Sequence, residues 1–162
     1  MSWRSAFLLQ ARSDYDTREI LNTQRVEYCH QLHYLQMASE KLAKGFLTPV
    51  ASTEPPKMTH AAFVRCLQVI KGRPDIRRAL NFSSTQTFSQ FVDSLLPLAE
   101  QVQRLAPSYA GIRGPNPEYP WQAATHGAVT APAEFDLPQF DSQSSQMNKL
   151  VRLVRDLLRV VS

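Results

Sequence analysis

YCHQLHYLQMASEKLAKGFL, residues 28–47, is a stretch with an unbroken helical period that contains no proline and a single glycine near its end. Apolar residues repeat along it at steps of three and four, and they return on a second side of the same helix. This pattern predicts a long helix at the centre of a bundle rather than at its edge. One face carries Tyr28, Leu32, Leu35, Ser39, Leu42 and Phe46, and another carries His30, Tyr34, Met37, Lys41 and Lys44.

The segments on either side of this central helix also follow a helical pattern, and glycine is scarce along the whole chain. We therefore predict an all-α protein, an up-and-down bundle of four to five helices with one long ordered loop before the last helix. A length of 162 residues corresponds to a single domain, residues 1–162. The other predicted helices span residues 3–22, 59–70, 74–82, 84–105 and 145–162, with Ser2, Thr59 and either Ser83 or Ser84 as caps.

Two of the predicted helices contain a feature that disturbs regular geometry. We expect the first helix to be irregular near Ser13–Asp16. Pro97 lies inside the pattern of helix 84–105, where it removes a backbone hydrogen bond. It is expected either to kink that helix near Asp93–Ser94 or to split it.

Residues 107–144 lack helical periodicity and carry six prolines and three glycines. A plain connection of this length is uncommon in a compact domain. The segment also contains Tyr119, Trp121, Phe135 and Phe140, which a disordered linker would usually lack. We expect an ordered loop held to the bundle by these aromatic residues, with a turn in GPNPEYP and a short hairpin around Gly127.

Composition indicates an ordinary globular protein with a mildly basic charge of +4. Such a charge permits contact with nucleic acid or acidic proteins without requiring it. No segment reaches the length needed to span a bilayer, and the N-terminal apolar run is too short for a signal peptide. We therefore predict a cytoplasmic protein without a membrane partner. Cys29 and Cys66 are expected to be free buried thiols, with a disulfide between them as the alternative.

Motifs for common catalytic and cofactor sites do not occur in the sequence. The glycines are isolated, so there is no phosphate-binding loop, and neither GxSxG nor HExxH is present. We therefore predict no cofactor. The charged pairs of Glu40 with Lys41 and Lys44, and of Asp14 with Arg18, have the spacing of surface pairs along a helix, and we interpret them as solvated.

The histidines give no metal site by spacing. His30 and His33 lie three residues apart on one helix, but a metal ion would need two more ligands, and nothing nearby offers them. His60 begins a predicted helix, where its ring could bond the free backbone groups of the first turn. His126 lies in the long loop and is uninformative.

The last predicted helix carries a basic stripe opposite its apolar face. Its positive residues are offset only by Asp156, so the stripe could contact RNA or DNA phosphates. No aromatic residue interleaves it, so it lacks the stacking platform of single-strand binders, and a solvated face is the alternative. The stripe consists of Lys149, Arg152, Arg155 and Arg159.

The central helix and the segment after it resemble the HEPN superfamily (higher eukaryotes and prokaryotes nucleotide-binding). The resemblance rests on LQMASEKLAKGFL, a proline-containing loop and THAAFVRCLQVI, together with LLQARSDYD before them, and covers roughly residues 5–70. It implies a helical bundle that usually forms a homodimer. Many members of the family are ribonucleases of toxin–antitoxin, CRISPR and phage-defence systems. The residues that fit the family pattern Q-x-A-x-E-K-x-x-K followed by His are Gln36, Ala38, Glu40, Lys41, Lys44 and His60.

The family's ribonuclease signature is an arginine followed, after four to six residues, by a histidine late in the domain. The late helices of this chain contain no histidine; only Arg25 and His30 have the spacing, at the start of the central helix. Five residues place the two about 140° apart on an ideal helix, which is poor geometry for a shared pocket. If this pair were catalytic, His30 would act as acid or base on the RNA 2′-hydroxyl, and Arg25 would stabilise the phosphorane charge.

The leading interpretation is a non-catalytic HEPN-like protein that binds nucleotide or RNA, or a partner such as an antitoxin, in a prokaryotic defence or toxin–antitoxin system. The alternatives are a metal-independent HEPN ribonuclease that uses Arg25 and His30, and a helical protein-interaction adaptor. The candidate binding residues are His60, Lys41, Lys44, Arg152, Arg155 and Arg159.

Overall fold

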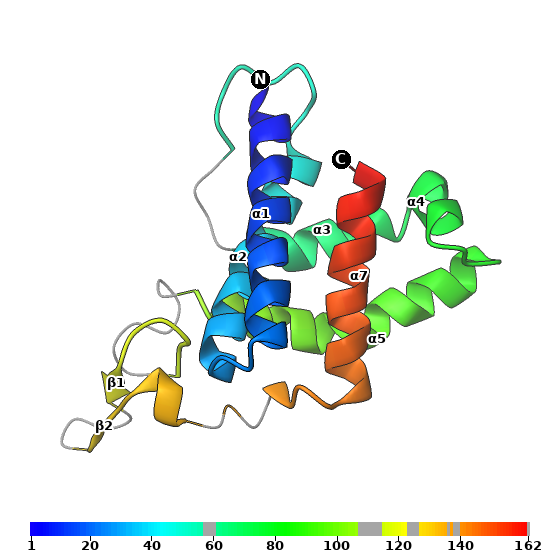
Figure 1. The fold of residues 1–162 in the computed structure, drawn as a ribbon. Coiled ribbons are helices and arrows are strands. Elements are labelled where there is room, and N and C mark those ends of the chain that lie inside the picture. The colour runs from blue at the N-terminus through cyan, green and yellow to red at the C-terminus, as the bar shows by residue number, and fades with distance from the viewer. Residues whose placement is uncertain (57–60, 107–114, 123–126, 136, 138–139, 162) are drawn as a thin grey trace.

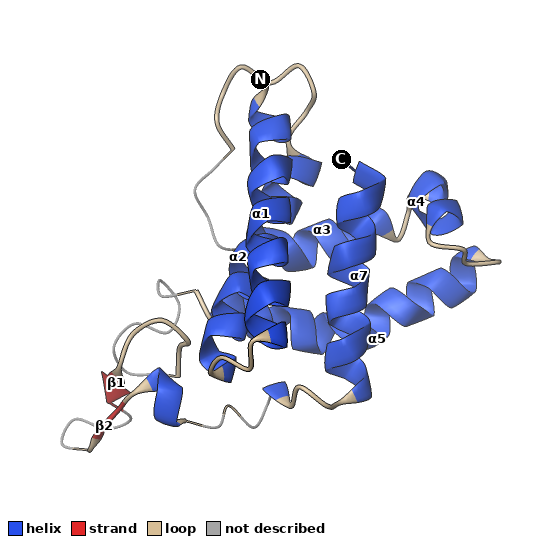
Figure 2. Cartoon of the chain, viewed as in Figure 1, coloured by secondary structure: helices blue, strands red, loops and turns tan. Residues whose placement is uncertain are grey.

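The computed structural model is all-α, as the sequence predicts (Figure 1, Figure 2). It describes residues 1–56, 61–106, 115–122, 127–135, 137 and 140–161. The α-helices are α1 (Trp3–Thr23), α2 (Tyr28–Leu47), α3 (Ala62–Ile70), α4 (Pro74–Ala79), α5 (Thr85–Arg104) and α7 (Ser145–Val161).

Helix α2 is the centre of the bundle, as its two apolar sides predict. It packs most extensively against α1 and also contacts α3, α5 and α7. The short turn at residues 24–27 makes α1 and α2 run side by side in opposite directions, while α7 lies beside α1 and α5 crosses behind α7 (Figure 1). Side chains from all of these helices form one core, which includes Leu32, Leu35, Leu42, Phe63, Leu67, Phe88, Val92, Leu95, Leu150, Val154 and Leu158.

Helix α1 is continuous, so the predicted irregularity near Ser13–Asp16 is wrong. The helix begins where Ser2 Oγ accepts a hydrogen bond from the backbone N–H of Ser5 at 3.2 Å. Polar side chains disturb a helix when they bond to its backbone. Asp14 accepts hydrogen bonds from other side chains, and the helix stays continuous although Thr17 Oγ1 donates to the backbone oxygen of Ser13 at 2.9 Å.

Helix α5 is also continuous, and Pro97 does not split it. Ser84 is its N-cap, with Oγ accepting from the backbone N–H of Thr87 at 3.1 Å, which confirms one of the two predicted caps. Pro97 lies on the exposed side of the helix. Solvent can therefore satisfy the carbonyl group that loses its partner to proline.

The start of helix α3 is held by a side chain from another helix. Gln103 Oε1 of α5 accepts hydrogen bonds from the backbone N–H groups of Phe63 and Val64, at 3.0 and 3.2 Å. The helix begins at Ala62 after Ala61, whereas the predicted cap Thr59 lies outside the described residues. A tertiary contact thus satisfies two backbone N–H groups of the first turn, which the N-cap residue Ala61 leaves without a side-chain acceptor.

The described parts of the long loop contain the predicted turn and hairpin. Asn116 Oδ1 accepts from the backbone N–H groups of Glu118 and Tyr119, at 2.9 and 2.7 Å. Strands β1 (Trp121–Gln122) and β2 (Val129–Thr130) pair antiparallel, with Trp121 opposite Thr130, and are followed by the short 3₁₀ helix η1 (Pro132–Glu134) (Figure 2).

The aromatic residues of this loop divide into two pairs. Trp121 and Phe140 are buried, and Phe140 joins the core. Phe135 packs edge-on against Trp121 with ring centroids 5.1 Å apart, yet it stays exposed, as does Tyr119. The expectation that these residues hold the loop to the bundle is therefore confirmed for Phe140 and wrong for the exposed Phe135 and Tyr119, while Trp121 is buried without joining the core.

Cys29 and Cys66 are free and buried, which confirms the prediction of free thiols. Burial raises the pKa of the Cys66 thiol to about 12, so it is inert as a nucleophile. Among the described residues, no helix combines the length and apolar character that crossing a bilayer requires.

Gly45 allows α1 and α2 to approach each other closely. A Cβ atom at this position would lie 2.8 Å from Leu8 Cγ and Cδ2 and 3.2 Å from the backbone oxygen of Arg4. Beside it, the Arg4 guanidinium donates to the carbonyl oxygens of Phe46 and Thr48 at the end of α2, at 3.1 and 3.3 Å. The end of α2 is therefore fitted against the start of α1 without room for a side chain.

We expect Gly45→Ala to lower the free energy of unfolding by about 1 kcal/mol. Overpacking of this kind costs about 1–3 kcal/mol, which exceeds the roughly 1 kcal/mol that alanine gains over glycine inside a helix. Gly72→Ala is the matched control, because a Cβ there would meet only the Val69 carbonyl oxygen at 3.7 Å. Urea denaturation of both variants tests this, and a Gly45→Ala variant more stable than wild type would contradict it.

Candidate functional site

A buried network of charged and amide side chains joins α1 to α2. Asp14 is only 3 % exposed; it accepts from Lys41 Nζ at 2.5 Å and from Gln10 Nε2 at 3.0 Å. Burial at this level makes each partner depend on the other, because an unpaired buried charge is costly.

A second part of this network lies one turn further along α2. Lys44 is 4 % exposed and donates to Glu40 Oε1 at 2.6 Å, while Gln36 Nε2 donates to Glu40 Oε2 at 2.8 Å. The Lys44 ammonium also lies 5.9 Å from the centroid of the Phe7 ring on α1. Lys41 and Lys44 therefore reach side chains of α1, while Gln36 and Lys44 both donate to Glu40 within α2.

These contacts correct the interpretation of the charged pairs as solvated. Lys41 pairs with Asp14 on the neighbouring helix, and Asp14 does not pair with Arg18, which contacts Glu19. The spacing of charges along one helix does not show which side of it a neighbouring helix covers. Here α1 covers the side of α2 that carries Lys41 and Lys44. Both candidate binding lysines are engaged by carboxylates within the protein.

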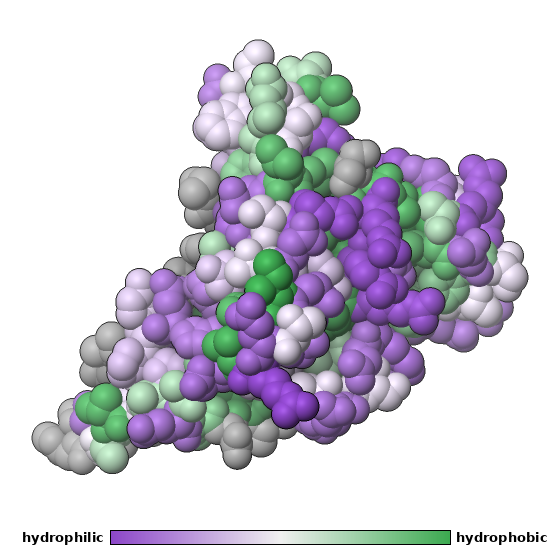
Figure 3. All heavy atoms as spheres, in the orientation of Figure 1, coloured by the Kyte–Doolittle hydropathy of each residue, from purple (hydrophilic) through white to green (hydrophobic). Residues whose placement is uncertain are grey.

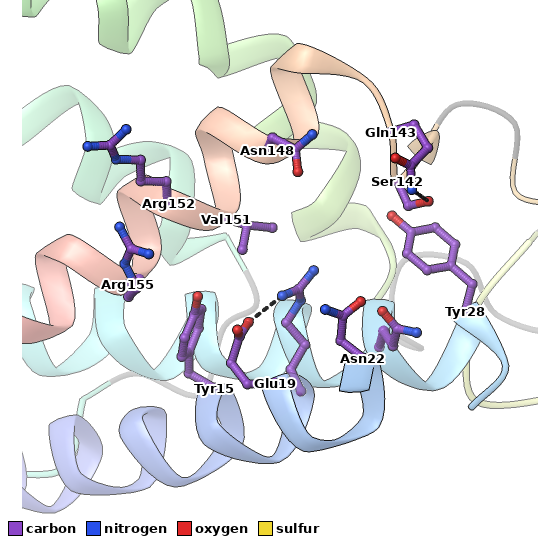
Figure 4. Close-up of a pocket in the computed structure, with 12 residues that line it drawn as sticks. Tyr15, Glu19, Asn22, Tyr28, Ser142, Gln143, Asn148, Val151, Arg152 and Arg155 are labelled. Carbon is purple, nitrogen blue, oxygen red and sulfur yellow. Dashed lines mark hydrogen bonds and ion pairs between the residues drawn. The ribbon is translucent and has the colours of Figure 1, made fainter. Parts of the chain in front are cut away.

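A polar pocket of about 490 Å³ lies between α1 and α7 (Figure 4). Tyr15, Glu19 and Asn22 project from α1 toward Arg155 and Val151 on α7, and Tyr28 closes one end near Ser142 and Gln143. The complete lining is Tyr15, Arg18, Glu19, Asn22, Tyr28, Gln31, Ser142, Gln143, Asn148, Val151, Arg152 and Arg155.

Two helical stripes of the same spacing form the walls of this pocket. Residues 15, 18, 19 and 22 of α1 lie at successive steps of three, one and three, and so do residues 148, 151, 152 and 155 of α7. Such steps keep four side chains on one face of a helix. The α1 stripe was missed from the sequence, although its regular spacing of polar and aromatic residues was a signal that could have revealed it.

Arg18 is the most deeply placed charge of the pocket. It is 9 % exposed, one terminal nitrogen contacts Glu19, and its Nε atom is buried without a hydrogen-bond partner in the described part of the chain. Arg152 and Arg155 are more exposed and enter from the opposite wall. Three arginines against the single carboxylate of Glu19 make the lining electropositive.

Two tyrosine hydroxyl groups complete the polar lining. Burial, as the main cause, raises the pKa of Tyr15 and of Tyr28 to about 12, and the charge of Arg18 partly opposes this rise. The Tyr28 hydroxyl oxygen is buried and lacks a hydrogen-bond partner among the described residues. At neutral pH both phenols are therefore neutral donors.

Asp156 organises the basic stripe of α7. Its carboxylate lies 3.0 Å from Arg155 Nε, 3.6 Å from Arg152 Nε and 3.9 Å from a terminal nitrogen of Arg159. Arg152 and Arg155 line the pocket as well, whereas Arg159 does not. The stripe is thus divided between the pocket and the open surface.

The other predicted site residues lie away from this pocket. Arg25 is exposed in the turn after α1 with a φ of 55°, and His30 is exposed on the first turn of α2; neither lines the pocket. His60 lies outside the described residues. The pocket therefore brings Arg152 and Arg155 together with Arg18, and it includes neither Arg25 nor His30.

His33 contacts the long loop rather than its neighbour His30. Its Nδ1 atom lies 3.7 Å from Glu118 Oε2, and burial lowers its pKa despite the opposing effect of Glu118. Within the described residues, no group of three or more His, Cys, Asp and Glu side chains could hold a metal ion.

Comparison of the chain with protein-family models, with curated proteins and with solved structures found no match.

Lys41→Met should lower the free energy of unfolding by about 3 kcal/mol, because it leaves the Asp14 carboxylate buried without its partner. The double variant Asp14→Leu/Lys41→Met should recover most of this loss, because it removes both charges. Arg104→Met is the control, since Arg104 and Glu100 form an exposed pair that contributes under about 1 kcal/mol. Equal losses for Lys41→Met and Arg104→Met in urea denaturation would contradict the role of the buried pair.

Tyr28→Phe should leave stability at pH 7 nearly unchanged and reduce the loss of stability at high pH. The unfolded phenol has a pKa near 10 and the folded one near 12, so the contribution of Tyr28 is complete below pH 10. It declines between pH 10 and 12 because the unfolded chain releases the proton first. Denaturation at pH 7 and pH 11 measures both effects, and an identical decline in wild type and variant would contradict the assignment.

Proposed function

We propose that this chain is a non-catalytic HEPN-like helical module that binds a nucleotide or RNA by its phosphate in the pocket between α1 and α7. The observation that carries the proposal is the buried Arg18 Nε atom, which lacks a partner in the described structure and lies in a pocket with Arg152 and Arg155. An unsatisfied buried donor costs free energy, and an acceptor oxygen would remove that cost.

The chemistry of the lining suits a phosphate group. Guanidinium groups offer planar, forked donors that match phosphate oxygens in pairs. The neutral Tyr28 hydroxyl offers one more donor at the far end of the pocket. Asn22 and Asn148 add amide groups on opposite walls, which suit the hydroxyl groups of a sugar.

The buried α1–α2 network supports the HEPN-like part of the proposal. Among the side chains that carry the resemblance, Lys41 joins α2 to Asp14 of α1, while Lys44 pairs with Glu40 within α2 and lies 5.9 Å from the centroid of the Phe7 ring of α1. This contact fixes Arg18 of α1 relative to Tyr28 of α2, so the pattern residues would act as a frame for the pocket. The proposal includes a homodimer or an antitoxin partner in a prokaryotic toxin–antitoxin or defence system, as the resemblance implies.

Two alternative functions have distinct tests. A ribonuclease that uses Arg25 and His30 would cleave RNA without a metal ion, and cleavage abolished by His30→Ala would overturn the non-catalytic proposal. An adaptor function is favoured by the exposed apolar side chains of the loop, Tyr119, Val129 and Phe135. Binding to RNA with a steep dependence on salt would count against the adaptor.

We expect adenosine monophosphate to bind the purified protein and Arg155→Gln to weaken this binding about tenfold. The variant loses a charge-assisted hydrogen bond, a contact of about 1.5–3 kcal/mol. Titration calorimetry at two salt concentrations measures the dissociation constant and its dependence on salt.

Arg104→Gln is the matched control, because it removes the same charge from an exposed position on α5 outside the pocket. It should leave the dissociation constant unchanged. Equal weakening by both substitutions would show a diffuse charge effect and contradict binding in the pocket, as would no binding of the nucleotide to the wild-type protein.

A further inference from the structure

A second cleft of about 330 Å³ lies on the other flank of α7, toward α4 and α5. Its apolar part is formed by Leu80, Phe82, Phe91 and Leu153, and its polar part by Lys149, Arg152 and Asp156. Figure 3 shows this face of the molecule, with a hydrophilic band over α7 and hydrophobic surface beside it toward α4.

The aromatic side of this cleft is a fixed surface. Phe82 follows α4 and packs against Phe91 and Phe88 of α5, with ring centroids 5.0 and 5.1 Å apart. Phe88 is fully buried, while Phe82 and Phe91 are half-buried and border the cleft. A ring supported from behind and open on one side suits the stacking of a flat aromatic group.

The two hollows meet at Arg152, which lines both. Residues 148, 151 and 155 of α7 face the first pocket, and residues 149, 153 and 156 face the cleft. Arg152 therefore stands on the ridge between them, with a side chain that is 75 % exposed. A ligand that crosses this ridge can contact both hollows and the guanidinium between them.

Charge also favours an anionic ligand along this path. Lys149 and Arg152 border the aromatic surface, and the Asp156 carboxylate within the cleft is engaged by Arg155 at 3.0 Å. Proteins that bind single strands without sequence preference combine a positive path for the backbone with aromatic rings for the bases. The α7 stripe has the first feature by itself, and the fold adds the second from α4 and α5.

We infer that the ligand is a single-stranded oligonucleotide that crosses α7 at Arg152, with the phosphate of one nucleotide in the first pocket and the base of the next nucleotide stacked against Phe82 and Phe91. This inference rests on the proposed function and narrows its ligand, a nucleotide or RNA, to a single strand that reaches both hollows. RNA and DNA strands share the chemistry that this path recognises, namely phosphate charge and a base ring.

The test compares adenosine monophosphate, hexaadenylate RNA and hexadeoxyadenylate DNA on the wild-type protein and on Phe91→Leu. The RNA should bind at least tenfold more tightly than the mononucleotide, and Phe91→Leu should remove about tenfold of that gain without changing mononucleotide binding. Phe91→Tyr keeps the ring and should retain tight binding. Fluorescence anisotropy with unlabelled competitors measures all three ligands, and melting temperatures verify that the variants are folded.

Each other result has a defined meaning. If the mononucleotide binds and neither hexamer binds more tightly, the inference of a single-stranded ligand is overturned, while the proposed phosphate pocket is not. An equal effect of Phe91→Leu on mononucleotide and hexamer would also overturn the stacking site. Failure of all three ligands to bind would overturn the proposed function itself. A preference for RNA over DNA would support the strand with an added contact to the 2′-hydroxyl.

Discussion

The pairing of Asp14 with Lys41 between α1 and α2 is the contact on which the rest of the arrangement depends. Further along the same contact, Gly45 removes the side chain that would keep the two helices apart beside Leu8. Buried charges add little net stability, yet a shift of one helix along the other would leave a carboxylate unpaired in the interior. The pair therefore defines how α1 lies on α2.

The position of α1 on α2 also determines which side chains reach the surface of the molecule. Once Asp14 faces α2, the adjoining stripe that contains Arg18 faces α7. Helix α7 then closes the pocket with its own basic side, since its opposite side is occupied by Leu150, Val154 and other core residues. The polar pocket is thus built where three helices meet, and its charged groups lie at the margin of the core.

Much of the fold follows directly from the sequence. The period of residues 28–47 predicted α2 at its observed bounds, and the all-α class follows from the helical patterns. Local chemistry predicted the hairpin around Gly127 and a cap at either Ser83 or Ser84, of which the structure uses Ser84. The cap of α3 by Gln103 could not be predicted, because the two segments meet only after folding. The candidate site was predicted in part, through Arg152 and Arg155, while its α1 wall was missed.

The sequence by itself determined which segments are helices and which side of each is apolar, because these properties depend on neighbours three and four residues apart. The tertiary structure decided which charges are buried, since Asp14 and Lys44 become interior only when α1 packs against α2. It also brought Arg18 opposite Arg155 and placed Phe82 and Phe91 beside α7. Such juxtapositions join residues far apart in the chain, so no local pattern records them.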